Sequence, residues 1–257
     1  MSGPTKSRFT IEQSIAPGKG QPMDVEYSRL ANATYGLQQM LLEEQARSRF
    51  LVEAFHDSLE RLAKACAFRD HEIAEHIDRL GHYARVIAQH LGWSGEDLEM
   101  IGKAAPMHDL GKIAIPDCIL LKAGPLTPEE WRIMETHTIV GAKLLDNSKS
   151  PLMQMARQIA LTHHERWDGT GYPYKLKGEQ IPMCGRIVMF ADQYDALRSK
   201  RSYKPAYSHD RVREILLEGD GRTMPCHFDP VMLEAFARNH ETFEEIFSAH
   251  KVLSNAS

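Results

Sequence analysis

The sequence contains few cysteines, only four among 257 residues. They stand far apart, at positions 66, 118, 184 and 226, with neither the density of a disulfide scaffold nor the paired spacing of a cysteine zinc site. No apolar run approaches the ~20 residues that a membrane helix needs, and Met1-Ser2-Gly3-Pro4 does not begin a signal peptide. We therefore expect a protein of the reducing cytoplasm with no membrane span and with four buried or half-buried thiols.

A strong excess of one charge is also lacking. The formal net charge is −4, from 31 basic and 35 acidic side chains, so no global field attracts a nucleic-acid polymer. Any recognition of phosphate must therefore be local.

Sustained alternation of polar and apolar residues, the pattern of a half-buried strand, is missing as well. With 42% hydrophobic residues, the chain can bury one sizeable core and carry an extension. These features predict an all-α fold, a helical bundle with an N-terminal helical extension.

The chain divides by composition into three parts. Residues 1–25 hold several glycines and prolines among polar neighbours, which predicts an irregular arm. Residues 26–68 have few helix breakers, and leucines recur at helical intervals, which predicts a long helix or a helical hairpin. Glu44 and Ser48 interrupt its apolar stripe, so this region is a candidate dimerisation or linker helix, or a helix packed on its own domain. Residues 69–257 carry the polar clusters described next.

The segment Met107-His108-Asp109-Leu110-Gly111-Lys112 places a neutral nitrogen ligand beside a carboxylate, with a cation three residues later. Such a pair alone is more often a capping or surface group. Here an apolar helical stripe runs through Leu98, Ile101 and Ala105 to His108 and directs that histidine toward the core. Pro106 should distort the helix locally, and residues 113–116 should leave it in extended form.

Other polar side chains also face inward on predicted helices. Glu72 and His76 lie one turn apart and share a face. His137 lies on the apolar face of a helix whose start is marked by Thr127-Pro128-Glu129-Glu130, a capping box with proline at its first position.

Two further predicted helices add ligands of the same kind. His163 continues the apolar face of a helix from about Pro151, and His164 diverges from it by about 100°. The pair should serve neighbouring metals, or one metal through a distorted helix end. Asp192 adjoins the inward face of a helix over 185–200, whereas Asp195 and His227 should be local hydrogen-bonding residues.

Eight such groups would each carry a burial penalty of a few kcal/mol unless something satisfied them. A shared metal cluster satisfies them all, and eight ligands exceed the needs of one ion. Imidazole and carboxylate without thiolate favour iron or manganese, with zinc or nickel as alternatives. The candidate ligands are Glu72, His76, His108, Asp109, His137, His163, His164 and Asp192.

A turn-rich loop and a run of positive charge add to these candidate ligands. The stretch from Arg166 to Pro173 is dense in turn formers and should be a loop of the kind that shapes pockets. Positive charge gathers after the Asp192 helix, and a nearby phosphate would explain it better than a solvated face would. The residues of this group are Arg198, Lys200, Arg201 and Lys204.

Together these motifs resemble an HD-GYP domain, the phosphodiesterase branch of the HD superfamily that degrades cyclic di-GMP. The resemblance covers residues from about 69 to 240, and we assign 69–257 to the catalytic domain. His108-Asp109 matches the HD signature, and Gly171-Tyr172-Pro173, after His163-His164-Glu165, matches the GYP signature. Phe190 to Leu197 resembles the acidic helix motif of the family.

The resemblance implies a role for each matching position. His108, Asp109, His137, His163, His164 and Asp192 would hold a dinuclear centre bridged by Asp109, and His76 matches a further ligand. Glu72 would complete a third metal site. Asp109 and Lys112 would be the catalytic pair, while Lys112, Tyr172, Arg201 and Lys204 would contact or border the substrate. Thr138 and Ser202 depart from common family residues and affect only substrate fit.

The implied activity is metal-dependent hydrolysis of cyclic di-GMP to pGpG and, with a third metal, to GMP. Two or three metal ions would activate the attacking water. Two alternatives stay open: a module that binds cyclic di-GMP, or a partner such as a GGDEF-domain cyclase, without turnover, and a hydrolase of another nucleotide or cyclic dinucleotide. The first 68 residues match no known sensor domain.

Glu72 yields a prediction that depends on the sequence alone. Glu72→Ala should remove the third ion and leave the others, because the remaining ligands still form a dinuclear set. The cut of cyclic di-GMP to pGpG should persist and the cut of pGpG to GMP should slow. Metal content per chain and separated product time courses check this, and an unchanged metal content would contradict it.

Overall fold

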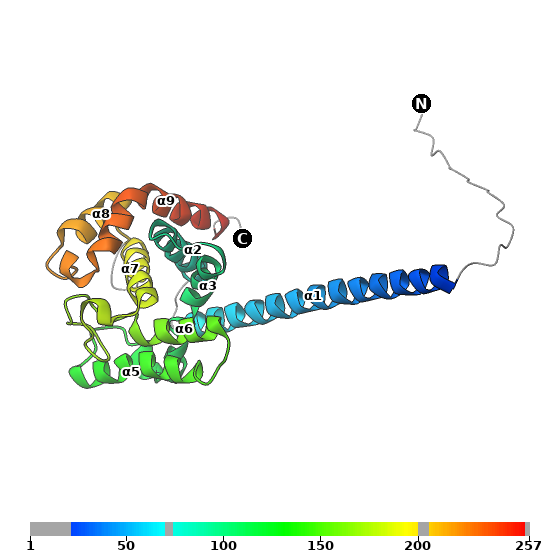
Figure 1. Ribbon diagram of the computed structural model, residues 1–257. Helices are drawn as coiled ribbons and strands as arrows, with labels where there is room; N and C mark the ends of the chain where they lie inside the picture. The colour runs from blue at the N-terminus through cyan, green and yellow to red at the C-terminus, as the bar shows by residue number, and fades with distance from the viewer. Residues whose placement is uncertain (1–21, 70–73, 200–205, 255–257) are drawn as a thin grey trace, which may run out of the picture. The chain divides into compact units, whose positions relative to one another are not determined.

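The computed structural model describes residues 22–69, 74–199 and 206–254, and within these ranges it contains helices and no strand. This confirms the predicted all-α fold. The α-helices are α1 (Pro22–Arg69), α2 (Ala74–His90), α3 (Gly95–Ala104), α4 (Asp117–Leu120), α5 (Pro128–Leu144), α6 (Pro151–Thr162), α7 (Met183–Arg198), α8 (His209–Glu218) and α9 (Pro230–Ser254) (Figure 1). Short 3-10 turns are η1 (Ala105–Met107), η2 (Leu110–Ala114), η3 (Gly178–Gln180) and η4 (Pro225–His227).

α1 is one continuous helix and not a hairpin. The chain separates into two compact units, residues 1–54 and 55–257, so α1 belongs to both. Its predicted stripe is largely exposed: Leu37 is 63% exposed and Leu51 58%. Only its last turns, with Ala63 and Ala67, join the hydrophobic core of the second unit.

That core forms where α2 packs against α3, α7 and α9, and where α6 packs against α3, α5 and α7. Aromatic rings fill its centre: Tyr83 stacks on Phe243 with ring centroids 4.8 Å apart, and Tyr194 meets Tyr83 edge to face. Burial of rings this large is a major favourable term in folding. The packing holds α2, α6 and α7 beside one another, and all three carry candidate metal ligands.

The segment around His108 differs from its prediction. α3 ends at Ala104, and Pro106 lies in the 3-10 turn η1, because proline has no N–H with which to continue the helix. A second 3-10 turn, η2, follows Asp109, so residues 113 and 114 are helical and only Ile115 and Pro116 are extended. The predicted kink is therefore confirmed, and the extended form predicted for residues 113–116 is wrong in its first half.

The other helix boundaries follow their sequence signals. Thr127 Oγ1 accepts a hydrogen bond from Glu130 N at 3.2 Å, and Glu130 Oε2 accepts one from Thr127 N at 2.8 Å, which is the predicted capping box. α6 begins at Pro151, and His163 is its C-cap.

The four cysteines are all free thiols, but their burial was partly mispredicted. Cys66 and Cys184 are buried, whereas Cys118 and Cys226 are exposed. Both exposed residues lie in very short helical elements, α4 and η4, which leave one side open to solvent.

Gly111 should tolerate no side chain. A Cβ there would collide with the carbonyl oxygen of His137 and lie 2.5 Å from Gly141 N, because η2 packs directly on α5. Gly111→Ala should lower the free energy of unfolding by about 1–3 kcal/mol through this overpacking. Thermal or denaturant unfolding measures it. Gly124→Ala is the matched control, since nothing lies within 4 Å of its added Cβ, and equal stability losses in both variants would refute the packing argument.

Candidate metal centre

Seven of the eight predicted ligands come together in the core of the second unit. They arise from α2, from the junction between η1 and η2, and from α5, α6 and α7. Their ligand atoms form two groups, each with members within 4.8 Å of one another: Asp109, His137, His163 and His164 in one, and His76, His108 and Asp192 in the other.

Asp109 lies between the two groups. Its Oδ1 is 3.2 Å from His137 Nε2 and 3.5 Å from His163 Nε2, while its Oδ2 is 3.1 Å from His108 Nε2. The two oxygens of one carboxylate thus face different histidine groups. This is the geometry that a carboxylate needs in order to bridge two cations.

The histidine rings are oriented by backbone carbonyls on their far side. Nδ1 lies 3.1 Å from Ala105 O in His108, 2.7 Å from Met134 O in His137, and 3.1 Å from Ile159 O in His163. A carbonyl only accepts, so these contacts assign the proton to Nδ1 and leave the lone pair on Nε2. Each Nε2 faces the centre, as metal-ligating histidines require.

His76 is oriented by a carboxylate instead. Its Nδ1 lies 2.8 Å from Asp195 Oδ2, and Asp195 also accepts bonds from Arg79 Nε at 2.6 Å and Arg79 Nη2 at 2.8 Å. Burial opposes the charge of Asp195, but the Arg79 and His76 hydrogen bonds outweigh it and lower the carboxyl pKa. The structural role predicted for Asp195 is confirmed, and that role is to hold a candidate ligand.

Two atoms of the centre show that a cation fits it. His108 Nε2 and Asp109 Oδ1 are buried and make no hydrogen bond to any described residue. Leaving such groups unsatisfied costs about 1–3 kcal/mol each, and more when they are charged. A divalent cation would satisfy both at once.

Protonation in the centre also suits metal binding. Burial, followed by the neighbouring histidines, lowers the pKa of His164 well below its ordinary value, so the imidazole is neutral. Burial opposes ionisation of Asp109, but Lys112 and His108 outweigh it and lower its pKa well below the usual range. The neutral imidazole of His164 and the ionised carboxylate of Asp109 are donors that suit first-row divalent metals.

His163 and His164 belong to the same candidate ligand group, which favours the arrangement in which both serve one metal. The helix ends at Thr162, and the chain turns at His163, so both rings converge, with centroids 4.1 Å apart. The end of the helix is therefore distorted, as the arrangement with one shared metal requires.

The loop after α6 closes over this end of the centre. Tyr172 stacks on His164 with ring centroids 4.6 Å apart, and its N–H donates to His164 O at 3.2 Å. Gly171 allows this approach, because a Cβ there would lie 2.5 Å from Glu165 Cα.

Glu165 is a functional residue whose role the sequence did not reveal. It is 1% exposed, and its carboxylate accepts hydrogen bonds from Tyr174 N at 2.7 Å and Leu176 N at 2.9 Å. It therefore holds the far side of the loop in place. Its position directly after two candidate ligands was the only available signal.

The structure describes only some of the residues that were predicted to contact the substrate. Lys112 Nζ lies 2.7 Å from Asp109 Oδ2, so the cation stands at the centre itself. Glu72, Arg201 and Lys204 lie outside the described residues. The expectation that Arg198 faces a phosphate is wrong. Arg198 is buried, donates to Glu244 Oε2 at 2.5 Å, and lies over the Phe247 ring.

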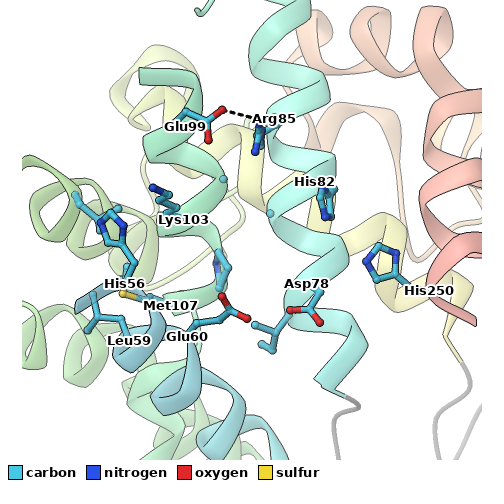
Figure 2. Close-up of a pocket in the computed structure, with 15 residues that line it drawn as sticks. His56, Leu59, Glu60, Asp78, His82, Arg85, Glu99, Lys103, Met107 and His250 are labelled. Carbon is cyan, nitrogen blue, oxygen red and sulfur yellow. Dashed lines mark hydrogen bonds and ion pairs between the residues drawn. The ribbon is translucent and has the colours of Figure 1, made fainter. Parts of the chain in front are cut away.

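A cavity of about 380 Å³ lies elsewhere, between the end of α1 and helices α2, α3 and α9 (Figure 2). An ion pair between Arg85 and Glu99 spans 2.6 Å in its lining, to which Lys103 and His56 also belong. None of the predicted metal or substrate residues lines it. It is therefore separate from the centre around Asp109.

The helical fold and the two ligand groups define a metal-site domain of the histidine-aspartate type. Residues 58–229 match the family model described as HD domain, and the chain belongs to that family. The resemblance to its HD-GYP branch is confirmed by relatives that are named cyclic di-GMP phosphodiesterases.

One such relative, from Vibrio cholerae, is 39% identical over 253 residues, which is 93% of this chain and 50% of that protein. The response regulator RpfG of Xanthomonas campestris, also named a cyclic di-GMP phosphodiesterase, is 43% identical over 76% of this chain and 50% of its own length. A third relative, the 3'3'-cGAMP-specific phosphodiesterase 2 of Vibrio cholerae, is 42% identical over 75% of this chain and 36% of its own length. The chain thus spans half or less of the length of these relatives.

A solved structure of a cyclic GMP-AMP phosphodiesterase from Vibrio cholerae shares the fold. Its TM-score is 0.52 at 19% identity, over 75% of this chain and 50% of that one. Within the described part of this chain, no helix is both long and apolar enough to cross a membrane.

Asp195→Asn should lower both the stability of the protein and its metal affinity, although Asp195 is not itself a candidate ligand. The amide cannot serve His76 and both Arg79 donors as the carboxylate does, so the free energy of unfolding should fall by about 3–5 kcal/mol. Metal affinity should fall about 10–100-fold, because His76 loses its orienting partner. Denaturant unfolding and metal titration measure the two effects.

Asp57→Asn is the control for that variant, since it breaks an exposed ion pair with Arg61 and should change neither quantity. Unchanged metal affinity in a folded Asp195→Asn protein would contradict the orienting role.

Proposed function

We propose that this protein hydrolyses the phosphodiester bonds of cyclic di-GMP, giving pGpG and, with a third metal, GMP. The observation that carries the proposal is Asp109 between two histidine groups, with Lys112 beside it. Relatives named cyclic di-GMP phosphodiesterases support the choice of substrate.

The centre would hold two or three divalent ions, and we favour iron or manganese. His137, His163 and His164 would serve one ion, His76, His108 and Asp192 another, and Asp109 both. The donor set has nitrogen and oxygen but no sulfur, which suits these metals. When bound, the ions would polarise the phosphodiester and lower the pKa of water. Glu72, from the resemblance alone, would add the third.

The protein's own side chains would bind and orient the dinucleotide. The Lys112 ammonium stands 2.7 Å from Asp109 Oδ2 and would stabilise charge on the non-bridging phosphate oxygens. Tyr172, held over His164 by its loop, would border the substrate pocket. Arg201 and Lys204, by resemblance, would position the second phosphate.

A second candidate is hydrolysis of a mixed cyclic dinucleotide. The relative named 3'3'-cGAMP-specific phosphodiesterase 2 is 42% identical, close to the identity of those named for cyclic di-GMP. A third candidate, binding of cyclic di-GMP or of a GGDEF-domain partner without turnover, is disfavoured by the completeness of the ligand set.

One experiment separates these candidates. The protein is purified anaerobically, its metal content per chain is measured, and it is incubated with cyclic di-GMP, 3'3'-cGAMP and simple nucleotides. Release of pGpG or GMP supports the first candidate, and products from 3'3'-cGAMP alone support the second. Tight binding without products supports the third. Full activity in His108→Ala or Asp109→Ala, which should both lose metal and turnover, would refute the metal-dependent mechanism.

Lys112→Met keeps the length of the side chain and removes its charge. It should lower kcat by about 10²-fold, as loss of one stabilising donor does, while metal content stays nearly unchanged. Steady-state kinetics and metal analysis check both. Lys143→Met removes an exposed cation near the end of α5 and is the control; equal loss in the two variants would mean that net charge, and not position, matters.

We further propose the division into an arm (1–25), a linker or dimerisation helix (26–68) and the catalytic domain (69–257); the boundary at 25 is too late, because α1 already begins at Pro22. The exposed apolar residues of α1 support a homodimer formed through that helix. Four free cysteines support a reducing cytoplasm.

A further inference from the structure

A second group of metal-ligand side chains lies outside the centre around Asp109. Asp168 follows α6 in the loop that carries Tyr172, and Cys226 and His227 belong to the η4 turn. One ligand atom from each lies within 4.8 Å of the other two. The group combines a carboxylate, a thiol and an imidazole; Asp168 lies 58 residues before Cys226, and His227 follows Cys226 directly.

The backbone already holds the two segments together. Trp167 N–H donates to His227 O at 2.8 Å, directly beside both Asp168 and Cys226. Asp168 Oδ1 accepts from Thr170 N at 3.0 Å and from Thr170 Oγ1 at 2.7 Å. Its Oδ2 faces Cys226 Sγ at 3.8 Å. The carboxylate is thus oriented with one oxygen toward the thiol.

Each member can present a donor to a cation from solvent. Asp168 and His227 are half-buried, so part of each side chain is open to solvent. Cys226 is exposed. Coordination through His227 Nδ1 would replace a long bond, 3.3 Å, from Met224 N.

We propose that Asp168, Cys226 and His227 form an accessory site for a borderline-soft divalent cation such as Zn²⁺. Zinc accepts sulfur, nitrogen and oxygen ligands together, and three protein ligands would leave its fourth position to water. On binding, Cys226 loses its S–H proton to solvent and forms the metal–sulfur bond. No electron transfer is involved.

A cation at this site would join the Tyr172 loop to η4. The loop now depends on the Trp167–His227 hydrogen bond and on the Glu165 carboxylate. A metal clamp beside the first of these would restrict how far Tyr172 moves from His164, with which it stacks. The accessory site would therefore influence the centre around Asp109 through this loop, and the two sites share no ligand.

Cobalt distinguishes the two sites, because only the accessory site contains sulfur. Wild-type protein titrated with Co²⁺ should develop a near-ultraviolet sulfur-to-cobalt charge-transfer band, whereas Co²⁺ bound by histidine and carboxylate gives none. Zn²⁺ should bleach the band. Cys226→Ser should abolish it, and Asp168→Asn or His227→Ala should weaken Co²⁺ affinity at this band by about tenfold or more.

Cys118→Ser is the matched control, since Cys118 is the other exposed cysteine and the band should survive its removal. Circular dichroism verifies that each variant is folded. Absence of the band in folded wild-type protein, or its persistence in Cys226→Ser, would overturn the proposal. Neither result depends on cyclic di-GMP hydrolysis, which the product assay tests separately.

Discussion

The structure depends on one carboxylate, that of Asp109, whose side chain is 15% exposed and whose Oδ1 is buried. Asp109 ionises at the centre because Lys112, followed by His108, outweighs the loss of solvation. Its two oxygens face two histidine groups that come from five different parts of the chain. Each of those helices must therefore keep its position if the charge is to stay compensated, and this couples the stability of the core to the ligands at its centre.

The irregular backbone around Asp109 makes that position available. An unbroken helix from α3 would carry consecutive side chains around its axis and direct His108 and Asp109 to different sides. Pro106 ends the α-helix, and two 3-10 turns with Asp109 between them bring both side chains to one centre. Gly111 then lets η2 approach α5 closely enough to place His137 opposite Asp109.

Hydrogen bonds on the side of the histidine rings that faces away from the centre orient the candidate ligands. Backbone carbonyls set the proton position of three histidines, and Asp195 with Arg79 does the same for His76. On the open side, the loop from Arg166 to Pro173 is held by Glu165 and by its bond to η4. The loop is thus fastened at its two sides by different elements, and near η4 the Cys226 thiol lies 3.8 Å from Asp168 Oδ2.

Much of this protein could be predicted from its sequence. The absence of alternation, the capping box at Thr127, the break at Pro106 and the inward spacing of the histidines are local properties, and local propensity and periodicity express them directly. The seven candidate ligands that the structure brings together could be named for the same reason, since inward polar residues on amphipathic helices are visible in one dimension. Only the tertiary structure decided how these ligands divide into two groups, because that division depends on distances between helices. It also decided that Arg198 pairs with Glu244, that Glu165 supports a loop, and that Asp168 meets Cys226 and His227. Each of these contacts joins residues whose proximity arises from packing and not from sequence spacing.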